Sequence, residues 1–469
     1  MPEDAHPEDA DAVMDHTSPS GSSATASDPA SAGWSSEVTD RAAHFRERPW
    51  TAGVIGLGYV GLPLAVTAAQ KGLACVGFDV SDAVVERLKG GTSHIGDVTH
   101  GELVEALDSG LEVTSDPSRL VDADTIFIAV PSPLGRNRQP DMSYIEAAAD
   151  TVREVARPGQ LITLESTTYP GTTDEIILPA ATAKGLELDR DVFVAFSPER
   201  VDPGNQRSTG EIPKVVGGVT PASGAVAEAA YRRLVPAVHL VSNARAAEMT
   251  KLLENTYRAV NIGLVNELAQ LSHELDIDVW EVIDAADTKP FGFQAFYPGP
   301  GVGGHCIPLD PQFLAWRARE AKFATRFIDL AEQVNTRMPA YNADRVAELL
   351  NRHGRPVWGT RILGVGVAYK PNVADDRESP AWDVLSELAA RGGDIGVLDP
   401  LIEPERIAAQ GYRTVGHSRD EIADHALAVV LTDHDAIDLA ELADAVPAVF
   451  DTRGAYRKRG IDAPNVTAL

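Results

Sequence analysis

The sequence has little cysteine, little lysine and no long apolar run, and each shortage excludes a class of protein. Only two of its 469 residues are cysteine, which excludes a disulfide-rich scaffold and favours a reducing, cytoplasmic location. No stretch of about 18 consecutive apolar residues occurs, so we expect no transmembrane helix and no membrane partner. The first 48 residues have neither the basic start nor the apolar centre of a signal peptide.

Basic residues are scarce relative to acids, with 41 Lys and Arg against 69 Asp and Glu and a formal net charge of −28. A nucleic-acid partner is not expected, because phosphate backbones require clustered cations. The acid excess fits either a salty cytoplasm or a genome rich in Arg, Ala and Asp codons. The sequence also lacks CxxC and HExxH spacing, so no metal is expected, even though His305 stands beside Cys306.

The length predicts two or three domains, because one hydrophobic core rarely serves so long a chain. Residues 1–48 are rich in Ser, Ala, Asp, Glu and Pro, which predicts a disordered acidic tail that can be deleted through residue 45 without loss of activity. Alternating strand and helix patterns then predict an α/β fold, with two Rossmann-like doubly wound domains joined by a long central helix. The expected boundaries are 49–240, 241–350 and 351–469.

The segment 51–80 shows the order strand, glycine turn, helix, strand. Its glycines have G-x-G-x-x-G spacing, and an aspartate follows 18 residues after the last glycine, at the end of the second strand. Such glycines permit a tight turn and the approach of a pyrophosphate to the helix N-terminus, while the acid bonds the adenosine ribose. The acid favours NAD over NADP, because it would repel a 2′-phosphate. The predicted cofactor-binding residues in this segment are Gly56, Gly58, Tyr59, Val60, Gly61 and Asp79.

One loop, residues 296–310 with the sequence FYPGPGVGGHCIPLD, concentrates glycine and proline. Glycines let its backbone approach a ligand, and prolines keep it stiff, so the loop can aim the thiol of Cys306. Thiolates are strong nucleophiles and form covalent intermediates readily. Most free cysteines are inert, but the flanking glycines and Asp310 favour a catalytic role here.

Apolar residues recur at helical spacing from about Ala244 to Leu275, which predicts a long central helix. Lys251 and Asn255 lie four residues apart and share one face. Such residues are usually solvated, although their position at the start of a mostly apolar helix is also compatible with a role in a site. A second helical region is predicted over 312–350, and a Rossmann-like unit after it lacks the third glycine of the fingerprint, so it need not bind a dinucleotide.

Four motifs, GLGYVG at 56–61, TKLLEN at 250–255, GVGGHCIPLD at 301–310 and YKPNVADDRES at 369–379, occur in an order that resembles the UDP-glucose/UDP-mannosaminuronate dehydrogenase family. The resemblance covers about residues 50–465. The form TKPFGFQAFYPGPGVGGHCIPLDP is most similar to the branch acting on UDP-N-acetylglucosamine. The resemblance implies an NAD-binding domain, a central region that forms a homodimer or higher homo-oligomer, and a C-terminal domain that binds the UDP-sugar.

The resemblance also implies a reaction, the NAD-dependent oxidation of a sugar C6 alcohol to the uronic acid for polysaccharide synthesis, through a thiohemiacetal and a thioester on Cys306. By resemblance, the catalytic residues are Cys306, Lys251, Asn255, Asp310, Glu199 and Thr168. Ser132 and Arg377 join the cofactor contacts, and the substrate contacts are Lys251, Asn255, Tyr297, Gly303 and Lys370. Tyr169 departs from the T-V-P form that is usual in the family.

Three other hypotheses remain open. UDP-glucose or UDP-N-acetylmannosamine could replace UDP-N-acetylglucosamine, because specificity depends on the shape of the pocket around C2. A non-catalytic sugar-nucleotide binding protein would be expected to lack the thiol or the polar residues that assist it. A two-domain enzyme that oxidises an alcohol once, to a ketone, would form one NADH per substrate instead of two.

Overall fold

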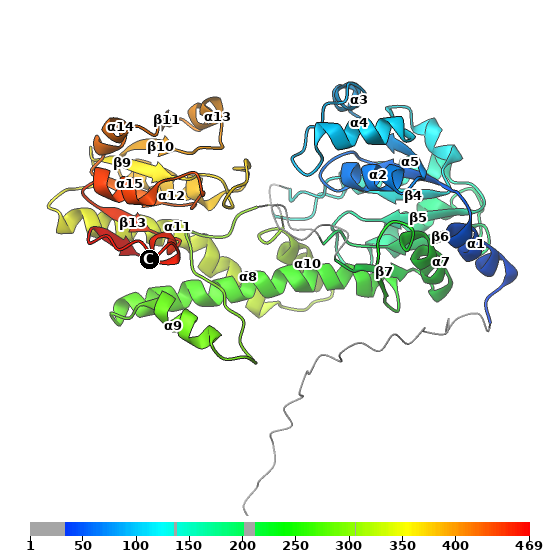
Figure 1. Cartoon of the computed structure of the whole chain (residues 1–469). Coiled ribbons are helices and arrows are strands. Elements are labelled where there is room, and N and C mark those ends of the chain that lie inside the picture. The colour runs from blue at the N-terminus through cyan, green and yellow to red at the C-terminus, as the bar shows by residue number, and fades with distance from the viewer. Residues whose placement is uncertain (1–32, 136–137, 201–211, 305) are drawn as a thin grey trace, which may run out of the picture.

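The computed structural model describes residues 33–135, 138–200, 212–304 and 306–469. Two α/β lobes are bridged by the helix α8 (Ala244–Glu274), which extends from the N-terminal lobe to below the C-terminal lobe (Figure 1). The predicted fold class, two Rossmann-like sheets joined by a long helix, is confirmed. The expectations for residues 1–32 and for His305 lie outside the described residues. Among the described helices, none has both the length and the apolar character needed to cross a bilayer.

The N-terminal lobe is built on a sheet of eight strands in the order β3-β2-β1-β4-β5-β6-β7-β8. Neighbouring strands are parallel except for β6 and β7. The strand order reverses at β1, and ligands of doubly wound sheets bind at such a switch point, beyond the carboxyl ends of the strands. The strands are β1 Thr51–Ile55, β2 Ala74–Phe78, β3 Leu111–Thr114, β4 Thr125–Ile128, β5 Gln160–Leu164, β6 Val192–Phe196, β7 Lys214–Gly218 and β8 Val238–Leu240.

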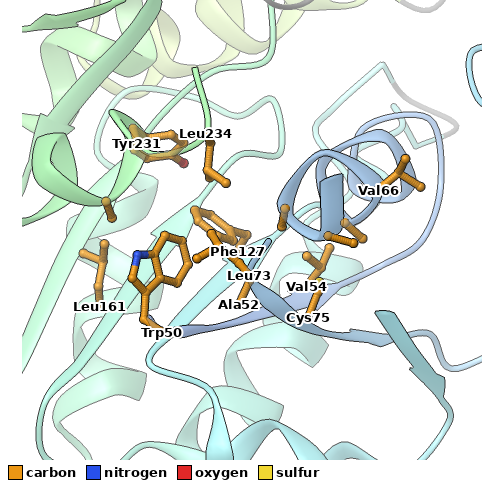
Figure 2. Packing of buried hydrophobic residues seen from close by; sticks show 14 of the residues in the cluster. Trp50, Ala52, Val54, Val66, Leu73, Cys75, Phe127, Leu161, Tyr231 and Leu234 are labelled. Carbon is orange, nitrogen blue, oxygen red and sulfur yellow. The ribbon is translucent and has the colours of Figure 1, made fainter. Parts of the chain in front are cut away.

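Apolar clusters cover both faces of this sheet, because successive strand residues point to opposite sides. On one face Phe127 packs with Trp50 and Tyr231 (Figure 2), whereas its neighbours Ile126 and Ile128 belong to the cluster on the other face. The helices of the lobe are α1 Ser36–Glu47, α2 Gly61–Gln70, α3 Asp82–Lys89, α4 His100–Asp108, α5 Ser143–Val155, α6 Leu178–Thr182 and α7 Pro221–Tyr231.

The expectation of a disordered tail through residue 48 is wrong for residues 36–47, which form helix α1. Val38, Ala42 and Phe45 share one face of α1 and are buried, and this helix packs against α7. The ring of Phe45 meets Trp50 edge-on at 5.3 Å between centroids. A single apolar stripe orders this helix, because the rest of the lobe supplies the surface that covers it. The polar composition of the whole segment concealed that stripe.

The C-terminal lobe is a second parallel sheet, of six strands in the order β11-β10-β9-β12-β13-β14, with an apolar cluster on each face. Its strands are β9 Arg361–Val365, β10 Asp394–Leu398, β11 Arg413–Thr414, β12 Leu427–Val430, β13 Val449–Asp451 and β14 Val466–Ala468. Its helices are α12 Pro380–Ala390, α13 Pro404–Ala409, α14 Arg419–Ala423, α15 Leu439–Ala445 and α16 Ala455–Lys458.

Three further helices connect the lobes: α9 (Val279–Asp287), α10 (Asp310–Glu320) and α11 (Arg326–Arg352). The helical region predicted over 312–350 comprises two helices, α10 and α11. They are separated by a turn in which Lys322 has a φ of +59°, a backbone conformation that interrupts a right-handed helix. The long helix α11 packs along α8 and α12, so it ties the central helix to the C-terminal lobe.

Candidate functional site

The glycine turn after β1 lies at the switch point of the N-terminal sheet, and its three glycines have different roles. Gly56 has a φ of +90°, and a Cβ there would lie 2.7 Å from the carbonyl oxygen of Ala129. A Cβ at Gly61 would collide with the carbonyl oxygen of Gly56. Gly58 differs, since no atom lies within 4 Å of its Cβ position. Two glycines are thus required by the turn itself, and the third leaves an open side that a pyrophosphate can approach.

Asp79 is fixed beside this turn at the end of β2. Its Oδ2 accepts a hydrogen bond from the Leu57 N–H at 2.9 Å, and its Oδ1 accepts one from Ser81 at 2.9 Å. The carboxylate remains partly exposed, so it can also accept hydrogen bonds from a ribose. These contacts fit an NAD cofactor on this edge of the sheet.

The C-terminal lobe has a similar arrangement, but there the aspartate is occupied by contacts with other protein groups. Asp399, at the end of β10, accepts the Val367 N–H at 2.6 Å, just as Asp79 accepts the N–H after Gly56. The same oxygen of Asp399 lies 3.2 Å from Nε2 of His434, whose side chain is fully buried. Asp399 is itself buried, so its lone pairs are already used within the lobe. This agrees with the expectation that the second unit need not bind a dinucleotide.

Two of the other predicted cofactor contacts meet across the two lobes. Tyr59 in the glycine turn is half exposed, and the guanidinium of Arg377 lies 4.8 Å from the centre of its ring. Arg377 also donates to Asp375 at 2.8 and 2.6 Å, which fixes its orientation. Ser132 follows β4 and is partly exposed. Arg377 therefore stands at the predicted cofactor site although it belongs to the other lobe.

Cys306 lies in the turn that begins α10. Its carbonyl oxygen accepts hydrogen bonds from the N–H groups of Asp310 at 2.9 Å and Leu309 at 3.2 Å. The residue is partly exposed, and it precedes the end of α10 at which a helix dipole stabilises negative charge such as a thiolate. The other cysteine differs, because burial raises the pKa of Cys75 to about 12 and leaves that thiol inert.

The glycines of the Cys306 loop pack against protein. A Cβ at Gly303 would lie 2.6 Å from Cδ of Pro380 and 2.7 Å from the carbonyl oxygen of Glu378. Gly304 has a φ of +85°, and its Cβ position lies 3.0 Å from the ring of Tyr369. The absence of a side chain at these two glycines thus allows close packing of the loop backbone. These contacts dock the loop onto the segment 369–380, the same segment that carries Lys370 and Arg377.

The loop also brings Asp310 to the polar face of α8. Nδ2 of Asn255 donates to Oδ2 of Asp310 at 2.6 Å, and both residues are buried. Burial raises the pKa of Asp310, while the charge of Lys251 and the Asn255 hydrogen bond partly offset that rise. The Asp310 N–H also donates to the carbonyl of Cys306, so the turn that carries Cys306 is joined through Asp310 to Asn255 of α8.

Thr168 is buried in the loop after β5, with its hydroxyl 2.5 Å from that of Thr172. Glu248 of α8 anchors this loop, because its carboxylate accepts the Gly171 N–H at 2.5 Å and the Thr173 N–H at 2.9 Å. Burial raises the pKa of Glu248 to about 7, against the effect of these hydrogen bonds. The sequence did not indicate Glu248, since a single acid in a helix carries no spacing signal.

Glu199 follows β6 and is held by a buried cation. Nζ of Lys214 donates to Oε2 of Glu199 and to Oε2 of Glu165, each at 2.8 Å. The hydroxyl of Tyr231 donates to the other oxygen of Glu165 at 2.5 Å. Sequence reasoning missed Lys214 and Glu165, because nothing in their spacing relates them to the SPER segment.

The predicted substrate contact Tyr297 lies in different surroundings. Its ring stacks on Trp280 at 5.5 Å, and its hydroxyl donates to Asp284 at 2.9 Å, so its described contacts are with α9. A cation that the sequence did not single out also packs against the Cys306 loop. Nη1 of Arg453 is 3.1 Å from the Cβ position of Gly299. Among the described residues, no three His, Cys, Asp or Glu side chains converge as a metal site.

Three family models match successive parts of the chain. They describe the NAD binding, central and UDP binding domains of the UDP-glucose/GDP-mannose dehydrogenase family, at residues 51–235, 245–337 and 363–458. The UDP-D-ManNAc dehydrogenase structure from Pyrococcus horikoshii has a TM-score of 0.80 at 32% identity, covering 89% of this chain and 98% of that one.

Curated relatives are similar over most of their length. The UDP-N-acetyl-D-mannosamine dehydrogenase of Salmonella typhi is 36% identical, over 87% of this chain and 99% of the relative. The UDP-N-acetyl-D-glucosamine 6-dehydrogenase of Pseudomonas aeruginosa is 35% identical, over 75% of this chain and 83% of the relative. Together with the glycine turn and the cluster at Cys306, these matches show that the chain belongs to the UDP-glucose/GDP-mannose dehydrogenase family of NAD-dependent oxidoreductases.

Proposed function

We propose that this enzyme oxidises the C6 alcohol of UDP-N-acetylglucosamine to the carboxylate through a covalent bond to Cys306. The observation that carries the proposal is the buried hydrogen bond from Asn255 to Asp310, which is the first residue of the helix after Cys306 and is influenced by the charge of Lys251. An enzyme that oxidises an alcohol only to a ketone needs no nucleophilic thiol. A protein that only binds sugar nucleotides needs neither the thiol nor a buried acid such as Asp310. The cluster therefore favours a four-electron oxidation over both alternatives.

The proposed reaction consists of two oxidations followed by a hydrolysis. The C6 hydroxyl loses a proton and a hydride to give an aldehyde, and the thiolate of Cys306 adds to the aldehyde carbon as a thiohemiacetal. Loss of the thiohemiacetal hydroxyl proton and of a second hydride gives a thioester. Water then attacks the carbonyl carbon and gives one proton to a base, the C–S bond breaks and the thiolate of Cys306 leaves. The carboxylic acid that forms releases its proton to give the carboxylate. NAD, when bound, takes up one hydride in each oxidation, so two NAD are consumed per sugar.

The side chains of this chain divide the remaining work. The cation of Lys251 stabilises the oxyanions that form at C6, which is the largest contribution such groups commonly make. Asp310, whose pKa is raised by burial, is suited to exchanging a proton with the Cys306 thiol or with water. Asn255 holds Asp310 and the sugar or water beside it. Glu199 assists hydrolysis of the thioester, and Thr168 helps to place the water.

The cofactor contacts are proposed on the same basis. The open side of Gly58 and the fixed carboxylate of Asp79 receive the pyrophosphate and the ribose. Tyr59 and Arg377 contact the cofactor on the side that faces the C-terminal lobe, and Ser132 contacts it beyond the end of β4. On the substrate side, Gly303, Tyr297 and Lys370 remain proposed contacts of the UDP-sugar.

The sugar itself is the finer part of the proposal. The TKPFGFQAFYPGPGVGGHCIPLDP segment and the Pseudomonas aeruginosa relative support UDP-N-acetylglucosamine. The Salmonella typhi relative and the Pyrococcus horikoshii structure support UDP-N-acetylmannosamine as a second candidate. Initial rates with these two sugars and UDP-glucose, at equal concentrations and saturating NAD, test the choice. We expect the highest kcat/KM with UDP-N-acetylglucosamine, and a higher value with either other sugar would overturn it.

We also propose that two chains pair along α8. Apolar side chains on one stripe of this helix and at its C-cap are exposed, each by 40% or more: Leu253, Tyr257, Leu264, Leu268, Leu271 and the C-cap residue Leu275. A contiguous apolar stripe of this length is typical of an interface. Light scattering is expected to give at least twice the 49.9 kDa of one chain. The double variant Leu264→Asp, Leu271→Asp should be monomeric, whereas Phe327→Asp, an exposed apolar site on α11, should not change the mass.

A further inference from the structure

We propose that Lys214 is a positioning residue for the hydrolytic step, which holds Glu199 ionised and oriented so that it accepts a proton from the water attacking the Cys306 thioester. The inference rests on the proposed function, because it presupposes that a thioester forms. It concerns a residue on β7 that no sequence motif indicated, and it assigns that residue a role distinct from those of Lys251 and Asp310.

Lys214 lies between two carboxylates that differ in their exposure to solvent. Its ammonium lies 2.8 Å from Glu165 and 2.8 Å from Glu199. The Lys214 side chain is 8% exposed and that of Glu165 is 0% exposed, whereas that of Glu199 is 19% exposed. The carboxylate of Glu165 is therefore buried inside the lobe, and that of Glu199 is partly exposed to solvent. Only Glu199 can reach water, so Glu165 serves to balance the buried ammonium.

The charges in this group depend on one another. Burial alone would lower the pKa of Lys214, but the charges of Glu165 and Glu199 outweigh it and raise the pKa. Burial raises the pKa of Glu165, and the charge of Glu199 raises it further, while Lys214 and the Tyr231 hydroxyl oppose both effects. Two neighbouring carboxylates without a cation tend to share a proton. The ammonium of Lys214 opposes that sharing, because it lies 2.8 Å from each carboxylate and stabilises the negative charge of both.

The orientation of Glu199 is fixed at both oxygens. Oε2 accepts from Lys214, and Oε1 accepts the N–H of Arg200 at 2.8 Å. Arg200 in turn donates to Glu254 of α8 at 2.5 and 3.2 Å, and Glu254 lies between Lys251 and Asn255 in the sequence. The SPER segment is therefore tied to β7 on one side and to the catalytic helix on the other.

This arrangement leaves Glu199 able to act on water. The Glu199 side chain is 19% exposed, so water can approach this carboxylate. In hydrolysis the water oxygen bonds to the thioester carbon, the C–S bond breaks, the thiolate leaves, and the water proton passes to Glu199. No electron transfer accompanies this step, and it requires Glu199 to be ionised beforehand.

Two substitutions with opposite expected effects test the role. Lys214→Met removes the cation, so the acid limb of the pH–rate profile should move to higher pH, kcat should fall by at least about 10-fold, and an acyl adduct on Cys306 should accumulate in intact-protein mass spectra. Glu165→Gln removes the competing carboxylate and leaves the ammonium to Glu199 alone, so the acid limb should move to lower pH. Lys184→Met, at an exposed lysine of the same lobe, serves as the control.

A merely structural role for Lys214 predicts lower melting temperatures with an unmoved pH profile, and that result overturns the inference while the two-NADH turnover stands. Shifts of the same sign in both charge variants overturn it as well. If Lys214→Met does not fold, the shift in Glu165→Gln decides alone. Absence of NADH formation by the wild type with every sugar tested overturns the proposed function, and the role of Lys214 with it.

Discussion

The amide of Asn255 donates a 2.6 Å hydrogen bond to the buried carboxylate of Asp310, and this contact joins the central helix to the first residue of α10. The Asp310 N–H in turn donates to the carbonyl of Cys306. A contact between residues 55 positions apart thus places the thiol loop against the helix that carries Lys251. The proposed active site therefore depends on this junction of two segments and does not lie within either one.

Substitutions of the two partners in the Asn255–Asp310 hydrogen bond should have different effects: one on turnover and the other on stability. Asp310→Asn keeps the volume but removes the acid, so we expect kcat to fall roughly 10²–10⁴-fold with little change in melting temperature. Asn255→Ala leaves a buried carboxylate without its amide donor, which should lower the free energy of unfolding by about 1–3 kcal/mol. Steady-state kinetics and thermal unfolding of both variants check this. Wild-type turnover by Asp310→Asn would rule out its role in proton transfer.

Glu248 should make stability depend on pH. Its pKa rises from the usual 4.5 to about 7 on folding, so in this range the folded state holds more protons than the unfolded state. Stability from this group is therefore full below about pH 4.5, falls as the pH rises towards 7, and changes no further above it. The pKa difference corresponds to roughly 3 kcal/mol.

The variant Glu248→Gln should remove that dependence. We expect its melting temperature relative to wild type to be higher at pH 8 than at pH 5. Glu267→Gln, at an exposed acid of the same helix, should follow the wild type at both values. Parallel curves for wild type and Glu248→Gln would show that Glu248 does not titrate in this range.

Two glycine substitutions should separate packing from cofactor binding. Gly303→Ala places a methyl group 2.6 Å from Pro380, so the loop must shift, at a cost of about 1–3 kcal/mol in stability and with loss of turnover. Gly58→Ala meets no protein atom, so it should fold normally and raise the KM for NAD. Melting temperatures and KM values for NAD of both variants check the contrast. A destabilised Gly58→Ala with an unchanged KM would contradict the assignment of its open side to the cofactor.

The N-terminus offers a further test. Deleting residues 1–32 should leave stability and activity unchanged, as expected from the composition of the segment. Deleting residues 1–45 removes Phe45 from the core, and loss of one buried phenylalanine side chain costs about 3–5 kcal/mol. Thermal unfolding of the two truncations checks the difference. Equal stability of both would show that α1 does not contribute to the fold.

The fold was largely predictable because its signals are local. A glycine turn, a short apolar strand and helical periodicity predict each unit where it stands, and the Asp79 position follows from the same pattern. Helix α1 was missed because its three buried residues are diluted among polar ones. The break near Lys322 was missed because a single residue with positive φ leaves no trace in hydrophobic spacing.

The site was only partly predictable, for a different reason. Cys306, Lys251, Asn255 and Asp310 lie in recognisable motifs, so both the motifs and their chemistry pointed to one cluster. Lys214, Glu165 and Glu248 make contacts with residues 15 to 77 positions away in the chain. These residues are brought together by the packing of β7 and α8 on the sheet. The sequence of a single segment does not reveal that packing.

The most direct test of the account is the number of NADH molecules formed per molecule of UDP-N-acetylglucosamine consumed, with Cys306→Ser measured beside the wild type. Two NADH per sugar for the wild type, with little turnover by Cys306→Ser, is the predicted result. One NADH per sugar, or two NADH per sugar from Cys306→Ser at the wild-type rate, would contradict oxidation through a thioester on Cys306.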